Sequence, residues 1–85
     1  MDKVDIIVTQ ADIDQGEQCQ AGTCPIALAA ERTTGLNVSV GIATLTLFDG
    51  NMVDYTLPDE AVAFINNFDH NIEDVKPFTF TAERA

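Results

Sequence analysis

The sequence predicts a small α+β domain with the order β-α-α-β-β-α-β, in which helices cover one face of a mainly antiparallel sheet. Three patterns predict this class: apolar alternation over residues 4–8, helical apolar spacing over 61–68, and a turn at 49–51 between two strand-like segments. The 85 residues suit one modest domain, and neither a linker nor a repeat divides them. We therefore expect a single domain over residues 1–85.

The N-terminal segment is expected to form a strand and then a short helix. Residues 4–8 place alternate apolar side chains on one face. Thr9 and Asp12 have the spacing of a capping box, in which the two residues satisfy each other's backbone N–H groups. We expect this helix to end at Gly16 in the left-handed conformation that glycine tolerates.

A second helix is expected after a polar loop at 17–23. Pro25 suits the first helical position, where its missing N–H costs nothing, and Gly35 is placed to end the helix. Residues 26–33 are rich in alanine, so a neighbouring element can approach this helix closely.

The segment 37–48 cannot be one regular strand with a single buried face. Its apolar residues divide between two faces by parity: Val38, Val40 and Ile42 on one, Leu45 and Leu47 on the other. Either both faces are covered, or a bulge near 41–44 shifts the phase, and Gly41 favours the bulge.

The turn at 49–51 is expected to have a three-residue loop. A two-residue loop would set Leu45 against Asp54. A three-residue loop makes every pair apolar: Leu47 with Val53, Leu45 with Tyr55, and Ala43 with Leu57. We expect Asn51 to take the left-handed third position of this loop.

Pro58 opens the most clearly patterned helix. Asp59 and Glu60 lie in its first turn, where the helix dipole favours anions. An apolar stripe follows, formed by Ala61, Phe64, Ile65 and Phe68. We expect the helix to fray through 66–71. A last strand after Pro77 directs two side chains toward the core: Phe78 and Phe80.

The charge is strongly acidic, with 14 acids against 4 bases and a formal net charge of −10. A chain with this charge repels phosphate backbones, so direct nucleic-acid binding is not expected. The N-terminus lacks the features of a signal peptide, and no apolar run reaches the roughly 18 residues of a membrane span. We expect a cytoplasmic protein that does not bind membranes.

Cys19, Cys24 and His70 are the weak candidates for metal or thiol chemistry. Zinc needs four ligands, and these residues leave the set incomplete, so we expect no metal and no cofactor. A disulfide across so short a loop is geometrically allowed, but a reducing compartment favours free thiols. Cys24 lies at a helix start, which lowers a thiol pKa, yet nothing in the sequence places the histidine near it as a base. No nucleotide-binding or hydrolase motif is present. We expect no enzymatic activity and no catalytic residue.

Three segments resemble a group of small phage and prophage proteins. They are CPIALAAER from Cys24, LPDEAVAFINNFD from Leu57 and KPFTF from Lys76. In that group a CP[IV]ALA segment preceded by a cysteine is followed by a valine-rich strand, an LPxxAxxFIxxFD helix and a PFxF strand. The resemblance covers about residues 9–81 and its motifs are structural. It implies a phage accessory protein in the host cytoplasm, with no assigned activity.

We therefore predict a small acidic binding protein whose partner is a host or viral protein. Carboxylates on a rigid surface can imitate phosphates and steer association with a protein that binds nucleic acid. The residues expected to contact the partner are Asp49, Asp54, Asp59, Glu60, Val38 and Val40. The alternative is a thiol- or metal-dependent protein centred on Cys19 and Cys24.

A homodimer or a tight partner interface is also expected, built on the uncharged segment. Residues 35–48 have no ionisable side chain, whereas exposed strand edges are usually protected by charges, proline or a covering element. The strand at 53–57 reaches back only to about Ala43 in the chosen register. Residues 37–42 should therefore pair with a terminal strand or with another subunit.

Overall fold

The structure, a computed structural model, describes residues 2–72 and 74–85, which contain five strands and three helices. The strands are β1 (Lys3–Val8), β2 (Asn37–Val40), β3 (Thr44–Phe48), β4 (Met52–Thr56) and β5 (Phe78–Arg84). The helices are α1 (Gln10–Gln15), α2 (Pro25–Thr34) and α3 (Asp59–His70). The sheet order is β1-β5-β4-β3-β2, and all neighbouring strands are antiparallel. The predicted α+β class is confirmed, with one strand more than the predicted order.

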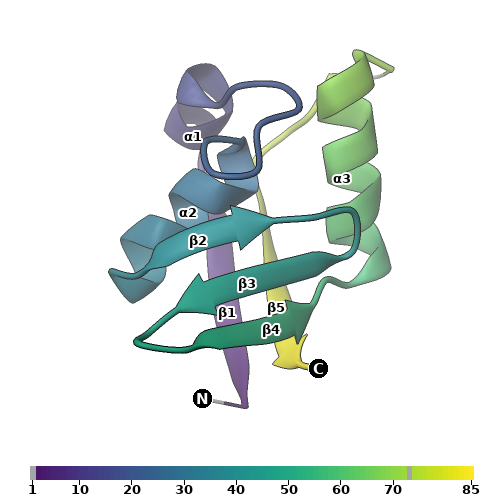
Figure 1. Cartoon of the computed structure of the whole chain (residues 1–85). Coiled ribbons are helices and arrows are strands. Elements are labelled where there is room, and N and C mark those ends of the chain that lie inside the picture. The colour runs from purple at the N-terminus through teal and green to yellow at the C-terminus, as the bar shows by residue number, and fades with distance from the viewer. Residues whose placement is uncertain (1, 73) are drawn as a thin grey trace.

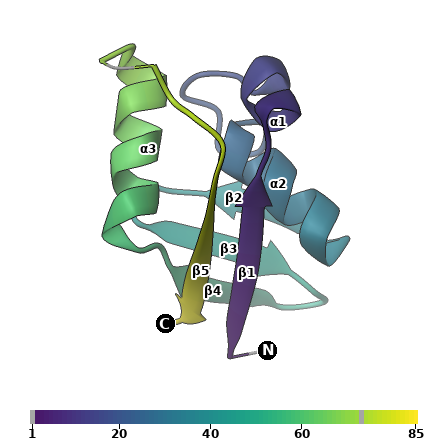
Figure 2. The ribbon, with the colours of Figure 1, turned by 180° about the vertical axis from the view of Figure 1, so that it is seen from behind.

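The sheet curls around α2. In Figure 1 the strands β2, β3 and β4 lie in front while β1 and β5 cross behind them, and Figure 2 shows the same arrangement from behind. The front strands β2, β3 and β4 join the back strands β1 and β5 where β4 pairs with β5. Tyr55 lies opposite Arg84 there, and Thr56 lies opposite Glu83. Helix α2 contacts both edge strands, β1 and β2. Its small side chains allow this close approach, as the sequence predicted, and they are fully buried: Ala27, Ala29 and Ala30.

The segment 37–48 is a hairpin, so the predicted bulge is wrong. Strands β2 and β3 pair with Val38 opposite Leu47 and Val40 opposite Leu45. Residues directly opposite each other share a face of the sheet, so both valines and both leucines reach the core. The turn at 41–43 is closed by the N–H of Gly41, which donates to the carbonyl oxygen of Thr44 at 2.7 Å.

The outer edge of β2 is approached by the α1–α2 loop, residues 16–24. The N–H of Val40 donates to the carbonyl oxygen of Ala21 at 2.9 Å. Residues 37–40 therefore pair with β3, and Val40 also bonds to the loop, so the expected pairing with a terminal strand is wrong. Pairing with another subunit stays a prediction. The loop is the covering element that the sequence pattern did not reveal.

The β3–β4 hairpin has the predicted register. Leu47 lies opposite Val53 and Leu45 opposite Tyr55, around a loop at 49–51. The left-handed residue is Gly50, with φ of 72°, so the prediction that Asn51 takes this conformation is wrong. Glycine has no Cβ and enters this region without the steric cost that asparagine would incur.

Two further predictions, about how α1 and α3 end, differ from the structure. The capping box at the start of α1 is present, with the N–H of Thr9 donating to Asp12 Oδ2 at 2.8 Å. Gly16 is extended rather than left-handed, and a Cβ at this position would lie 2.5 Å from Cδ of Pro25. Helix α3 continues as a regular helix to His70, and Asn71 ends it in the left-handed conformation. The predicted fraying through residues 66–71 is therefore wrong.

Helix α3 packs on the sheet through aromatic rings. The Phe64 ring stacks on Phe78 with centroids 4.8 Å apart, and Phe78 stacks on Phe80 at 5.4 Å. Phe64 and Phe80 are buried as expected, whereas Phe68 and Phe78 are only partly buried. None of the helices described has the length and apolar character needed to cross a bilayer.

Candidate functional site

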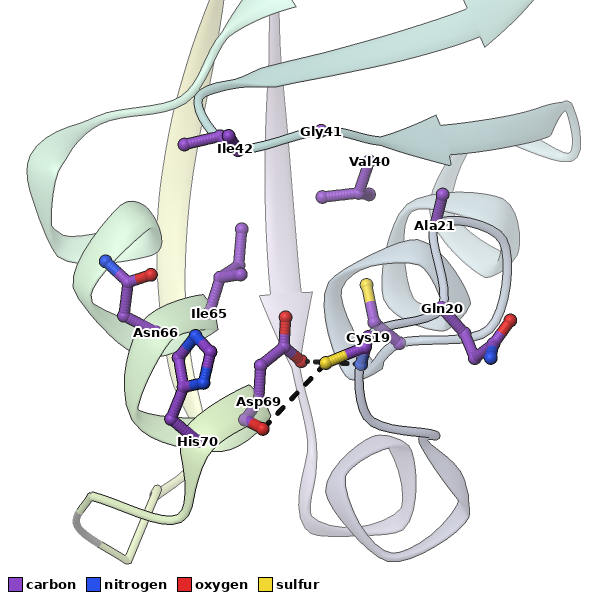
Figure 3. Close-up of a pocket in the computed structure, with 11 residues that line it drawn as sticks. Cys19, Gln20, Ala21, Val40, Gly41, Ile42, Ile65, Asn66, Asp69 and His70 are labelled. Carbon is purple, nitrogen blue, oxygen red and sulfur yellow. Dashed lines mark hydrogen bonds between the residues drawn. The ribbon is translucent and has the colours of Figure 1, made fainter.

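A pocket of about 370 Å³ opens between the α1–α2 loop, the β2–β3 turn and α3 (Figure 3). The loop contributes Cys19, the turn contributes Ile42, and α3 contributes Ile65, Asp69 and His70. Three segments that are distant in sequence therefore form one concave surface. We take this pocket as the candidate site.

Hydrogen bonds from two neighbouring residues, Gln18 and Cys19, hold the α1–α2 loop against the end of α3. Gln18 Nε2 donates to the carbonyl oxygen of Phe68 and to Asn71 Oδ1, each at 2.8 Å. The backbone N–H of Cys19 donates to Asp69 Oδ1 at 3.0 Å. Cys19 has a φ of 58°, a conformation uncommon outside glycine, which these contacts help to hold. The loop wall of the pocket is thus positioned by α3.

The structure brings together all three weak candidates, because Cys19, Cys24 and His70 all line this pocket. No group of three or more His, Cys, Asp or Glu side chains in the described part of the chain is arranged to hold a metal ion. Asp69 also lines the pocket, although it belongs to no site motif in the sequence. An acid in the last turn of a helix opposes the helix dipole, and this signal could have marked it.

Cys24 has a structural role at the start of α2. Its side chain is 6% exposed, and its Sγ accepts a hydrogen bond from the N–H of Ala27 at 3.4 Å. Burial raises the pKa of the Cys24 thiol, and the negative charge of Asp69 raises it further. These effects outweigh the lowering expected at a helix start, so Cys24 is a protonated cap at neutral pH.

Cys19 is exposed and forms no disulfide, and the group that its thiol contacts is a backbone carbonyl. Its thiol points toward the end of α3 and donates weakly to the carbonyl oxygen of Asp69 at 3.9 Å (Figure 3). A carbonyl oxygen cannot remove the thiol proton. The geometry therefore gives no support to nucleophilic chemistry at Cys19.

The four acids expected to bind a partner are exposed but do not form one cluster. We call them the β4 carboxylates: Asp49, Asp54, Asp59 and Glu60. Asp49 lies in the turn before β4, Asp54 lies within the strand, and the other two begin α3 beyond its far end (Figure 1). Thr46 Oγ1 donates to Asp54 Oδ1 at 2.8 Å and orients that carboxylate.

Val38 and Val40, the other expected contact residues, are only 8% and 7% exposed. Their side chains belong to the core on the face covered by α2. Outside the pocket, which Val40 lines, they present little side-chain surface to a partner, because the β2–β3 hairpin turns both of them inward.

The acidic side chains are largely uncompensated. Of the thirteen acids that the structure describes, eleven are exposed, Asp69 is half-buried and Asp12 is buried. Asp12 pairs with Arg32 in the one salt bridge found among the described residues. Three other cations remain to offset the exposed carboxylates: Lys3, Lys76 and Arg84.

Comparisons with protein-family models, curated proteins and solved structures find no match. The interpretation of the pocket therefore rests on its own geometry, and the resemblance to phage proteins stays a prediction.

Proposed function

We propose that this protein is a non-enzymatic binding protein that associates with a basic region of a protein partner. The observation that carries the proposal is the set of eleven exposed carboxylates among the described residues, against three cations outside the Asp12–Arg32 pair. Such a surface attracts a basic partner over several ångströms and repels acidic ones, which gives specificity and a fast association rate.

The placement of the β4 carboxylates supports a patterned surface. They follow a strand and the first turn of a helix, two elements with well-defined backbones. Asp54 is also oriented by Thr46. Fixed carboxylates can stand in for the phosphates that a nucleic-acid-binding protein recognises, whereas the same charge disfavours direct binding to nucleic acid.

The cellular setting follows from the resemblance and is part of the proposal. A phage accessory protein of this kind would act in the host cytoplasm on a host or viral protein. The capped, protonated Cys24 and the contact of the Cys19 thiol with a backbone carbonyl support a binding role over the alternative thiol chemistry.

Affinity capture with two charge-matched variants tests the proposal. The first variant combines Asp54→Asn, Asp59→Asn and Glu60→Gln. The control combines Asp14→Asn, Glu17→Gln and Glu31→Gln, which are exposed elsewhere, and both variants have a formal net charge of −7 instead of −10. We expect the wild type and the control to retain a basic protein at about 50 mM salt and to release it at about 500 mM, where charges are screened. The first variant should lose it.

The outcomes distinguish an effect of where the carboxylates lie from an effect of the total charge of the protein. Equal loss in both variants would show that only the net charge matters, and capture that survives high salt would contradict a charge-driven interface. If the captured protein binds nucleic acid, duplex DNA should compete for it. Failure of that competition would contradict phosphate mimicry.

A further inference from the structure

Two sources of negative potential meet at the α3 wall of the pocket. Asp69 is the penultimate residue of a 12-residue helix, where the unpaired carbonyl groups give the helix its negative end. Its carboxylate is half-buried at the pocket, and Cys19 N–H occupies Oδ1. An acid at this helical position is locally unfavourable, and the overall charge of −10 adds to the cost.

No lysine or arginine of the described chain lines this pocket to compensate Asp69. Arg32 is engaged by Asp12 on the other side of α2. His70 lines the pocket one residue further along α3, and Figure 3 shows its ring beside Asn66. The pocket thus offers a carboxylate that no lysine or arginine among its described lining residues neutralises.

The rest of the pocket is mixed, with the polar side chains of Gln20 and Asn66 beside an apolar part. Val40, Ile65 and Ala21 line it, and Ile42 stands over it from the β2–β3 turn with 84% of its surface exposed (Figure 3). Ile42 thus gives the rim of the pocket an accessible apolar side chain. An occupant therefore needs an apolar body as well as a positive charge.

These features exclude a bare metal ion, since the described residues include no suitable ligand group. We propose that the pocket receives a lysine side chain of the basic partner, whose alkyl stem packs on Ile42 and Ile65 and whose ammonium group pairs with Asp69. Lysine suits the site better than arginine because one carboxylate oxygen already accepts from Cys19, which disfavours a two-pronged guanidinium contact. This inference rests on the proposed function and adds a second contact to the one expected at the β4 carboxylates.

Two small probes test the pocket without the partner. Blocked lysine (Nα-acetyl-lysine N-methylamide) and blocked norleucine, its uncharged analogue, are titrated at matched ionic strength while backbone amide NMR signals are followed. We expect blocked lysine to shift the signals of Cys19, Ile42 and Asp69, with an affinity about three- to tenfold above that of blocked norleucine. Equal affinities, shifts located elsewhere, or tighter binding of blocked arginine would overturn the proposal.

Matched variants identify the contacts. Asp69→Asn keeps an acceptor for the Cys19 N–H and should remove the preference for blocked lysine, whereas Glu31→Gln removes an exposed charge outside the pocket and should preserve it. Ile42→Ala should weaken both probes, and Met52→Ala, an exposed apolar residue outside the pocket, should weaken neither. A preference that persists in Asp69→Asn would overturn the assigned ammonium contact.

The pocket and the proposed function can fail separately. Alkylation of the exposed Cys19 with iodoacetamide fills the pocket wall and should abolish capture of the basic protein. If salt-sensitive capture persists after alkylation, the pocket is not the binding site although the proposed function stands. If blocked lysine binds in the pocket but no basic protein is captured, the proposed function fails and the pocket assignment stands.

Discussion

Arg32 on α2 forms a two-pronged contact with Asp12 on α1, in which Nη1 reaches Oδ1 and Nη2 lies 2.9 Å from Oδ2. Asp12 is the one charged residue buried among those described, at 4% exposure. The pair fixes α1 against α2 and so helps to set where the α1–α2 loop begins.

The pair should make stability depend on pH. Burial raises the pKa of Asp12, but hydrogen bonds from Arg32 and Thr9 outweigh it and leave the pKa below its usual 3.8. The stabilisation is therefore complete above pH 3.8 and is lost as the pH falls through the lower folded-state pKa. We expect Asp12→Asn to reduce the free energy of unfolding by about 1–3 kcal/mol at pH 7. Urea unfolding at several pH values measures this.

The difference between Asp12→Asn and the wild type should shrink in acid, because the wild-type carboxyl group is then also uncharged. Asp14→Asn, an exposed change on the same helix, should alter stability by no more than about 0.5 kcal/mol. A difference that stays constant down to pH 2 would contradict the assigned ionisation.

Phe64 should be the main anchor of α3. Phe64→Ala is expected to cost about 3–5 kcal/mol, because the ring is buried and stacks on Phe78. Phe68→Ala should cost less since that ring is partly buried, and Phe48→Ala, an exposed phenylalanine on β3, should cost least. Urea unfolding ranks the three variants, and an unchanged midpoint for Phe64→Ala would contradict the packing described.

The two thiols should differ in reactivity. Cys19 is exposed, whereas Cys24 is buried and has a raised pKa that leaves little thiolate at neutral pH. We expect Ellman's reagent to modify one thiol of the native protein rapidly and the second only after denaturation. Protein purified without oxidant but containing a Cys19–Cys24 disulfide would contradict the prediction of free thiols.

A lysine at position 40 should unfold the domain, and one at position 42 should not. Val40 is buried beneath α2, so Val40→Lys buries a charge without a partner. Ile42→Lys places the same side chain two residues away in solvent, and we expect a change within about 0.5 kcal/mol. Circular dichroism melting curves compare the two variants. Equal melting temperatures would contradict the hairpin register.

The predicted homodimer can be tested on the wild-type chain by sedimentation equilibrium. A mass near twice 9.2 kDa would support it, and a 9.2-kDa species at high micromolar concentration would contradict it. The uncharged β2 strand does not by itself require a second subunit, because residues 37–40 pair with β3 and the α1–α2 loop bonds to Val40.

Local interactions were predictable from the sequence. The capping box of Thr9 with Asp12, the start of α2 at Pro25, its end at Gly35 and the apolar register across the 49–51 turn are all as predicted. Each depends on residues within about one helical turn or one tight hairpin, where side-chain chemistry and backbone geometry act directly on each other.

Only the tertiary structure decided the rest. The parity break in 37–48 showed that the segment is irregular, but a bulge and a hairpin both remove the break. Burial of Val38 and Val40 in the same core as Leu45 and Leu47 selects the hairpin. The extended conformation of Gly16 depends on the close approach of Pro25. Asp69 meets Cys19 across 50 residues because the aromatic contacts of α3 bring its last turn to the α1–α2 loop. Sequence periodicity describes one element at a time, whereas a pocket built by three elements depends on how their faces pack together.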